Sequence, residues 1–175
     1  LMEDPWRVIM TSDHPNGGAF YHYPEIIYLL MDKNFRQEFL SQMPVEIHER
    51  SVLADLEREY SLYEIAIITR AAPARVLGMK NKGHLGVGAD ADITIYAPQQ
   101  NRQEMFERPR WVYKDGLMVV EDGEIQAHQF GRTFYTAPDF DEEFLPHIKD
   151  WFDESYSIQF RNYQIEKQDL PQAEE

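Results

Sequence analysis

Two neighbouring residues near the start of this 175-residue chain, Asp13 and His14, are of types that can do metal or proton chemistry. They follow a compact apolar run, residues 6–11, which is typical of a buried strand, and they precede the turn-forming residues 16–18. A carboxylate at the carboxyl end of a buried strand can bind a divalent cation and accept a proton from water. The triplet Asp13-His14-Pro15 alone is weak evidence, because Asp also bonds backbone in ordinary turns.

A second motif lies downstream, in residues 69–78 (TRAAPARVLG) and residues 82–93 (KGHLGVGADADI). Its glycines permit tight bends, and Asp90 and Asp92 favour turn hydrogen bonds before a strand, so we interpret it as architecture. A phosphate-binding loop is the alternative. The sequence disfavours it, because no Lys-Ser or Lys-Thr pair follows and the local charge is negative.

Asp13 and this motif, in this order and spacing, resemble the amidohydrolase superfamily. In that family the eighth strand of a barrel ends in an Asp that binds the metal centre and handles the proton of the attacking water. The resemblance implies that Asp13 is both metal ligand and catalytic proton acceptor, and that His14 and Asn16 lie beside the substrate. Ala72 stands where the family usually has Asn, so the hydrogen bonds made by that Asn in the family do not carry over to this chain.

Further segments narrow the resemblance. Residues 13–18, 23–26 and 64–71, with parts of the tail, are similar to the A subunits of formylmethanofuran dehydrogenases and of bacterial formyltransferase/hydrolase complexes. This resemblance implies hydrolysis or formation of an N-formyl amide on a methanofuran-type carrier in one-carbon metabolism. It also implies a binuclear metal centre, with zinc expected, and the other subunits of such a complex as partners. The family's His and Lys ligands are not in this chain, so the fragment alone is expected to be inactive.

Two other functions stay open. A dihydroorotase- or hydantoinase-like enzyme is one, because Asp-His also occurs there at this strand, although the long C-terminal extension argues against it. A non-catalytic assembly subunit, whose acidic surface and tail hold partners, is the other.

The remaining histidines are scattered and more typical of surface or packing positions. Residues 21–23 either line the mouth of the site or form a packed aromatic cluster.

The elements expected around Asp13 are helices first and strands later. Apolar periodicity predicts helices near residues 24–31, 35–43 and 52–56. Ser61-x-x-Glu64 is a capping-box pattern, and a separate helix is expected over residues 71–78, with Pro73 in its first turn and Gly78 past its end. From Lys82 onward the period is near two, with a strand at 91–96, a hairpin at 111–120 around Asp-Gly, and a further Asp-Gly turn at 122–123. Residues 141–153 suggest a helix.

The fold class we expect is α/β plus β: the C-terminal end of a metal-dependent (β/α)8 barrel, part of a small β-sandwich, and a C-terminal extension. Residues 1–81 would hold the last barrel strand and the following helices, residues 82–131 the sandwich segment, and residues 132–175 an acidic, aromatic arm. The chain is too short for a whole barrel, which needs about 250 residues.

Composition restricts the partners. There are 31 acidic against 17 basic residues, a formal net charge of −14, which disfavours nucleic acid and anionic membranes. The chain has no cysteine, so it contains neither a disulfide nor a Cys-ligated metal site. No apolar stretch has the length of a membrane span and no signal pattern begins the chain, so a cytoplasmic location is expected. Because the chain starts at Leu1, we expect a fragment or a processed protein.

Overall fold

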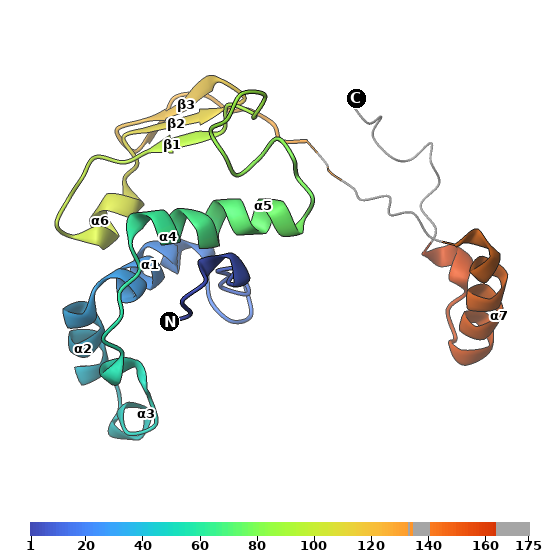
Figure 1. The fold of residues 1–175 in the computed structure, drawn as a ribbon, viewed down its shortest axis with the longest axis horizontal. Helices are drawn as coiled ribbons and strands as arrows, with labels where there is room; N and C mark the ends of the chain where they lie inside the picture. The colour runs from blue at the N-terminus through green and yellow to red at the C-terminus, as the bar shows by residue number, and fades with distance from the viewer. Residues whose placement is uncertain (133, 135–140, 164–175) are drawn as a thin grey trace. The chain divides into compact units, whose positions relative to one another are not determined.

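The computed structural model describes residues 1–132, 134 and 141–163 of the chain. It divides into two units, residues 1–129 and residues 130–175 (Figure 1). The first unit holds most of the helices and a four-stranded sheet. Among the described residues, no helix is long and apolar enough to cross a membrane. The extended arm expected after residue 153 is wrong where the structure describes it, because the helix there continues to Ser155 and residues 160–162 form a 3-10 turn. The rest of that arm, residues 164–175, lies outside the described residues.

The N-terminal segment is not the strand expected for residues 6–11. A 3-10 turn, η1 (Pro5–Arg7), forms first, capped by the side chain of Asp4. The backbone is extended at Val8 (φ −121°, ψ 132°), but among the described residues its ladder-like bonding is limited to Met10 N–H, which donates to Ile68 O at 3.1 Å. A strand needs a neighbouring strand, and none lies beside this segment in the described chain.

Three helices follow: α1 (Tyr23–Met31), which η2 (Phe20–His22) precedes, α2 (Lys33–Ser41) and the short α3 (Val45–His48). The first two were predicted, with Pro24 in the first turn of α1. The helix expected at residues 52–56 is wrong: only a 3-10 turn, η3 (Leu53–Asp55), forms there. Leu56 already has an extended backbone (φ −76°, ψ 107°), and the buried Arg36 guanidinium holds the chain there by bonding the carbonyls of Leu56 and Arg58 at 2.8 and 2.9 Å, so the helical turn ends at Asp55.

The next helix is one continuous run rather than two. It comprises α4 (Leu62–Ala66), a π-helical turn η4 (Ile67–Ala71) and α5 (Ala72–Val76). Pro73 has no N–H for the Thr69 carbonyl. The π turn accommodates it, with Ala72 N–H bonding Ile67 O, while the Arg70 guanidinium bonds Thr69 O at 3.0 Å. The capping box at the start is confirmed, and the helix ends before Gly78 at φ +69°.

The sheet has the order β1 (Ile93–Ile95), β2 (Trp111–Lys114), β3 (Leu117–Glu121), β4 (Glu124–Ile125), all antiparallel. Both predicted Asp-Gly turns are confirmed. Asp115 and Asp122 have φ of 49° and 47°, and the following glycines are also positive, as hairpin turns of this kind require. A helix that was not predicted, α6 (Arg102–Glu107), lies between β1 and β2 and packs against α1.

The core of the first unit joins the N-terminal segment to these helices. Its buried members are Ile27, Tyr60, Ile65 and Ile68, and the alternate residues Val8 and Met10 pack against them. Ile9, between them, is exposed. The extended segment that leads to Asp13 is therefore fixed on the core through every second side chain.

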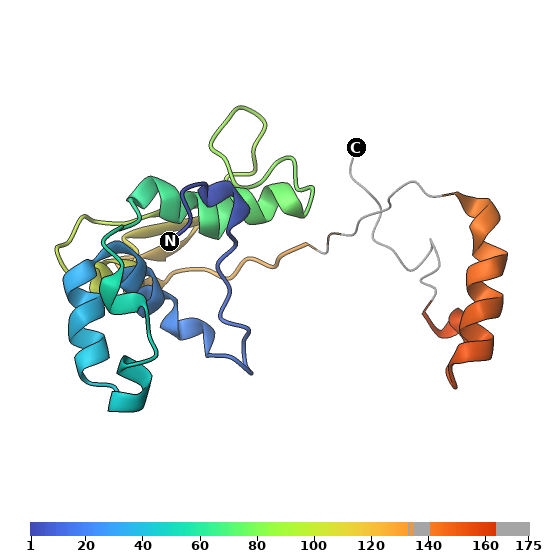
Figure 2. The same ribbon diagram turned by 60° about the horizontal axis from the view of Figure 1, so that its bottom comes forward.

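The second unit contains η5 (Glu142–Phe144), α7 (Leu145–Ser155) and η6 (Phe160–Asn162), in orange in Figures 1 and 2. The helix expected at residues 141–153 is thus confirmed with a small shift. Phe152 is the centre of its packing, with ring centroids 4.7 Å from Tyr156, 5.8 Å from Phe160 and 5.4 Å from Tyr163. Trp151 on the same helix is 58% exposed.

Candidate functional site

The loop that carries Asp13 is a tight turn. Asp13 has φ +52°, a left-handed conformation that Asp tolerates better than most residues. Its N–H donates to Thr11 Oγ1 at 3.1 Å, and its carbonyl accepts from Gly17 N–H at 2.9 Å. The backbone on both sides of the Asp13 side chain is therefore fixed by hydrogen bonds.

Gly17 is needed for this turn to close. A Cβ atom at Gly17 would lie 2.9 Å from Ser12 O, closer than real Cβ atoms come, and 3.0 Å from Asp13 Cβ, which is tighter than most real Cβ contacts. At Gly18 the nearest atom to such a Cβ, again Ser12 O, is 3.6 Å away, which is ordinary contact. The sequence Asn-Gly-Gly thus has a specific use: its first glycine lets the turn fold against Asp13.

The Asp13 carboxylate is exposed, and among the described residues no hydrogen bond or ion pair reaches it. His14 and Asn16 lie exposed in the same turn, and the His14 ring meets Phe20 edge-on at 5.2 Å. The structure thus brings the three predicted residues together in one loop, without a hydrogen bond between their side chains. A carboxylate with both oxygens open is a suitable ligand for a divalent cation, and one such group needs further ligands from elsewhere.

Behind this loop lies a contact that the sequence did not indicate. Ser12 is 8% exposed, and its N–H donates to the Tyr23 hydroxyl at 3.3 Å. Tyr23 is the first residue of α1. The two residues are eleven positions apart, and no motif links them.

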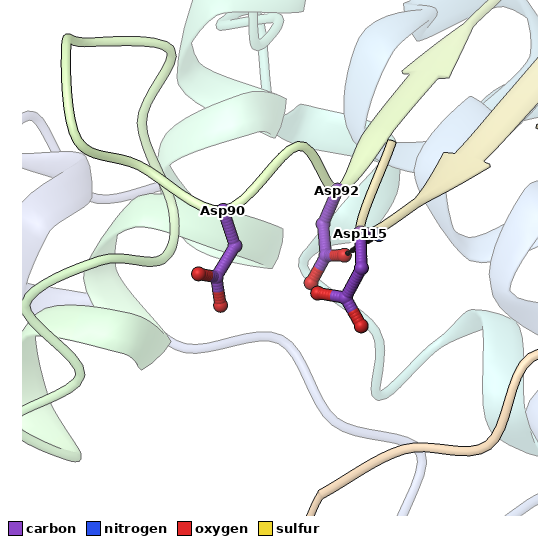
Figure 3. A group of neighbouring side chains, drawn as sticks. All are labelled: Asp90, Asp92 and Asp115. Atoms are coloured by element: carbon purple, nitrogen blue, oxygen red, sulfur yellow. Dashed lines mark hydrogen bonds between the residues drawn. The ribbon is translucent and has the colours of Figure 1, made fainter. Parts of the chain in front are cut away.

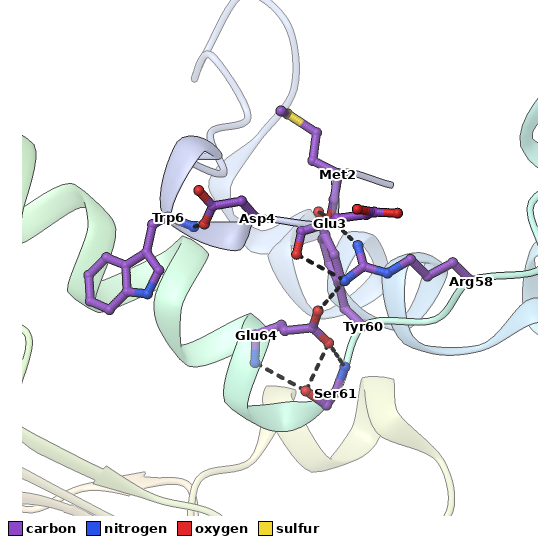
Figure 4. Close-up of polar contacts among 8 residues, drawn as sticks. All are labelled: Met2, Glu3, Asp4, Trp6, Arg58, Tyr60, Ser61 and Glu64. Carbon is purple, nitrogen blue, oxygen red and sulfur yellow. Dashed lines mark hydrogen bonds and ion pairs between the residues drawn. The ribbon is translucent and has the colours of Figure 1, made fainter.

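The start of the same segment is also anchored (Figure 4). The Arg58 guanidinium bonds the carbonyl of Met2, bonds that of Glu3 at 3.4 Å, and forms an ion pair with Glu64 at 2.5 Å. Tyr60 Oη also donates to Met2 O at 3.2 Å. The Ser61 backbone N–H, with smaller help from its hydroxyl and from Arg58, holds the pKa of Glu64 below its usual range against the effect of burial.

A second acidic group, Asp90, Asp92 and Asp115, lies at the end of the sheet, with one carboxylate oxygen of each within 4.8 Å of the others (Figure 3). Such a group could hold a cation, but two lysines already form ion pairs with all three carboxylates. Lys82 Nζ lies 2.6 Å from Asp90 and 2.5 Å from Asp92. Lys114 Nζ lies 3.0 Å from Asp92 and 2.8 Å from Asp115.

Asp92 is the centre of this ion-pair cluster, because its Oδ1 also accepts the Asp115 N–H at 3.0 Å. Burial favours its neutral form. The hydrogen bonds from Lys82, Asp115 N–H and Lys114 outweigh that effect and hold the pKa of Asp92 far below its usual range. The hydrogen bonds of Lys82 to Asp90 and Asp92 raise the pKa of Lys82, although burial opposes its charge. Lys82 comes from the Gly-rich loop and Asp92 precedes β1, so the cluster fixes the loop on the sheet, as expected for architecture.

A hollow of about 480 Å³ lies on the sheet and is lined by Arg70, Asp92, Tyr113 and His128 among others. Asp13 does not line it. Asp13, the predicted metal ligand, is therefore separate from this hollow.

Comparison with known proteins identifies the family to which the chain belongs. The amidohydrolase family model matches residues 1–126, so the chain belongs to the amidohydrolase family, and the resemblance seen in the motifs is confirmed. The helices and small sheet are consistent with part of that fold.

Particular relatives narrow the similarity. The chain is 49% identical over 133 residues to the A subunit of the formyltransferase/hydrolase complex Fhc of Methylorubrum extorquens, covering 76% of this chain and 24% of that protein. It is 42% identical over 171 residues to Protein FwdA of Methanocaldococcus jannaschii, covering 91% of this chain and 30% of that one.

A solved structure is similar as well: the formyltransferase/hydrolase complex (FhcABCD) of Methylorubrum extorquens with methylofuran. Its matching chain has 39% identity and a TM-score of 0.78, over 98% of this chain and 31% of that one. The chain thus spans between a quarter and a third of the length of these relatives.

Proposed function

We propose that the full-length protein is a metal-dependent hydrolase of an N-formyl amide, and that Asp13 is a metal ligand and the proton acceptor of its site. The observation that carries this proposal is the Asp13 carboxylate, which is exposed and without a hydrogen-bond partner among the described residues, on a turn fixed by Thr11 and Gly17. Membership of the amidohydrolase family supports it.

A bound divalent metal, with zinc proposed, would polarise the formyl carbonyl and lower the pKa of the attacking water. Asp13 would hold the metal through its carboxylate and accept the proton of the attacking water. The water oxygen bonds to the formyl carbon, the C–N bond breaks, and Asp13 returns the proton to the amine nitrogen that leaves. His14 and Asn16, in the same turn, would contact the substrate. The remaining ligands of the proposed binuclear centre come from outside this chain.

The names of the relatives support a substrate and a setting. One belongs to a formyltransferase/hydrolase complex, and the similar solved complex contains methylofuran. We therefore propose a methanofuran-type formyl carrier as substrate, in one-carbon metabolism, and the other subunits of such a complex as partners. The exposed aromatic residues of the second unit, such as Phe144 and Trp151, suit an assembly surface.

The test compares full-length wild type with Asp13→Asn in hydrolysis of N-formyl amines, with dihydroorotate and a hydantoin as rival substrates. General acid–base catalysis contributes about 10²–10⁴-fold, so Asp13→Asn should lose at least a hundredfold in kcat. Bound metal is measured in parallel by elemental analysis. Asp122→Asn is the matched control, because Asp122 also has positive φ (47°) on an exposed turn. Full activity in Asp13→Asn would refute the proposal. Faster turnover of dihydroorotate or the hydantoin than of N-formyl amines would mean that the substrate is a cyclic amide.

A further inference from the structure

One hydrogen bond ties the Asp13 turn to the rest of the first unit. Among the described residues, the other hydrogen bonds of residues 11–18 stay within the turn, joining Asp13 to Thr11 and to Gly17. The bond from Ser12 N–H to Tyr23 Oη, at 3.3 Å, leaves the turn and reaches α1. The internal bonds set the shape of the turn. Beyond the anchoring of Val8 and Met10 on the core, its position depends on the bond to Tyr23.

Tyr23 is well fixed for this purpose. It begins α1, and one turn further along Ile27 is 7% exposed and belongs to the core. Leu30, a second member of α1, packs against the same core. The hydroxyl is therefore carried by a helix that the core holds in place.

Ser12 depends on this outside contact more than most residues. Its Oγ is buried, and in the part of the chain that the structure describes it has no hydrogen-bond partner. A buried hydroxyl without a partner disfavours the inward position of the side chain. The backbone bond to Tyr23 counteracts that effect, and the residue it holds is bonded directly to Asp13.

We propose that Tyr23 is a positioning residue for Asp13, an inference that rests on the proposed function. Its hydroxyl holds the Ser12 peptide group, and through it the left-handed Asp13 backbone, so that the carboxylate points to one place. Tyr23 does not itself touch the reacting atoms. Its effect therefore falls on the affinity of the site for metal and on kcat, with little effect on KM.

The test is Tyr23→Phe in the full-length protein, which removes the hydroxyl and keeps the ring and the helix. A misplacement of about 1 Å in a reacting group can cost about 100-fold in rate, and because Tyr23 acts on Asp13 only through Ser12, the expected loss is smaller. We expect about tenfold weaker zinc binding in competition with a chelator, about tenfold lower kcat, and KM within twofold. Hydrogen exchange of the Ser12 amide should also become faster, which reports the bond itself without any metal.

Tyr63→Phe is the matched control, because Tyr63 is 72% exposed on α4 and its hydroxyl has no hydrogen bond within the described chain. All its readouts should equal wild type. If Tyr23→Phe keeps wild-type zinc affinity and kcat while Asp13→Asn loses both, the positioning role is refuted and the proposed function stands. A lower melting temperature with unchanged zinc affinity would mean a purely structural role and would refute it too. If Asp13→Asn is fully active, the proposed function itself fails.

Discussion

Asp92 is where one substitution should do most to loosen the Gly-rich loop from the sheet. Its carboxylate contacts two other pieces of chain: Lys82 of the Gly-rich loop at 2.5 Å, and the turn after β2, through Lys114 at 3.0 Å and the Asp115 N–H at 3.0 Å. Asp92→Asn keeps the size and one acceptor oxygen but removes the charge. Both ion pairs are lost, and the backbone bond of Asp115 is weakened.

The magnitude follows from the exposure of these groups. The side chains of Lys82, Lys114 and Asp92 are 18%, 27% and 31% exposed, so solvent screens them in part. Each ion pair is then worth about 0.5–1 kcal/mol, and the bond from the Asp115 N–H to a charged acceptor about 1 kcal/mol. Asp92→Asn should therefore cost about 2–3 kcal/mol in total, of which the part that acts on the β2–β3 hairpin, through Lys114 and the Asp115 N–H, is about 1.5–2 kcal/mol. Hydrogen exchange of the hairpin amides measures this free energy locally in the full-length protein.

The pH dependence gives an independent check. The folded-state pKa of Asp92 is below its unfolded value, which is about 3.9. Its contribution is therefore complete above that pH and is lost as the pH falls toward the folded-state pKa. Hairpin protection in wild type and Asp92→Asn should differ most near neutral pH and converge below about pH 4.

Asp122→Asn is the control for this prediction, since it makes the same Asp-to-Asn change at an exposed Asp-Gly turn of the same sheet, where Asn suits the turn equally well. A hairpin as well protected in Asp92→Asn as in wild type at neutral pH would refute the reasoning. So would a difference that persists unchanged in acid.

Two further substitutions test the turn and the long helix. Gly17→Ala should reduce kcat of the full-length protein at least tenfold, because its Cβ would displace the backbone beside Asp13. Gly18→Ala, which has room for a Cβ, should have wild-type kcat in the same assay. Equal kcat in the two variants would contradict the tight turn at Gly17. Ser61→Ala should lower the free energy of unfolding by about 1 kcal/mol, since it removes the cap of α4. Urea unfolding checks this, with Ser61→Asn, which keeps a capping oxygen, expected to lose less than Ser61→Ala.

What the sequence predicted well was local. The capping box of Ser61 and Glu64 and both Asp-Gly hairpin turns involve residues at most four apart, and their chemistry decides the backbone directly. The same local signal predicts α6 but was not used: Asn101 caps that helix by accepting Glu104 N–H at 3.2 Å, in the same i to i+3 spacing as Ser61 and Glu64 at the start of α4. The prediction of a separate helix at Pro73 was wrong, because a proline in the first turn of a helix and a proline accommodated by a π turn inside a helix look alike in sequence.

What could not be predicted depends on residues far apart in the chain. The strand expected at residues 6–11 needs a partner strand. Within the described residues, the one hydrogen bond of this kind is from Met10 N–H to Ile68 O, which belongs to a helix. The bond between Ser12 and Tyr23 and the pairing of Lys114 with Asp92 join positions eleven and twenty-two apart. Sequence placed Asp13, His14 and Asn16 in one loop, but only the fold gives the helix that holds that loop.

The two acidic features of the chain differ in a way that bears on chemistry. Binding a cation at Asp92 would require displacing two ammonium groups, and the low pKa of Asp92 measures how strongly those groups and the Asp115 N–H already stabilise its charge. The Asp13 carboxylate has no such competitor among the described residues, so a metal would have only water to displace there. A group of three carboxylates is thus the weaker candidate, and a single carboxylate on a fixed turn is the stronger one, because ligand strength depends on which lone pairs are free rather than on how many acids are near.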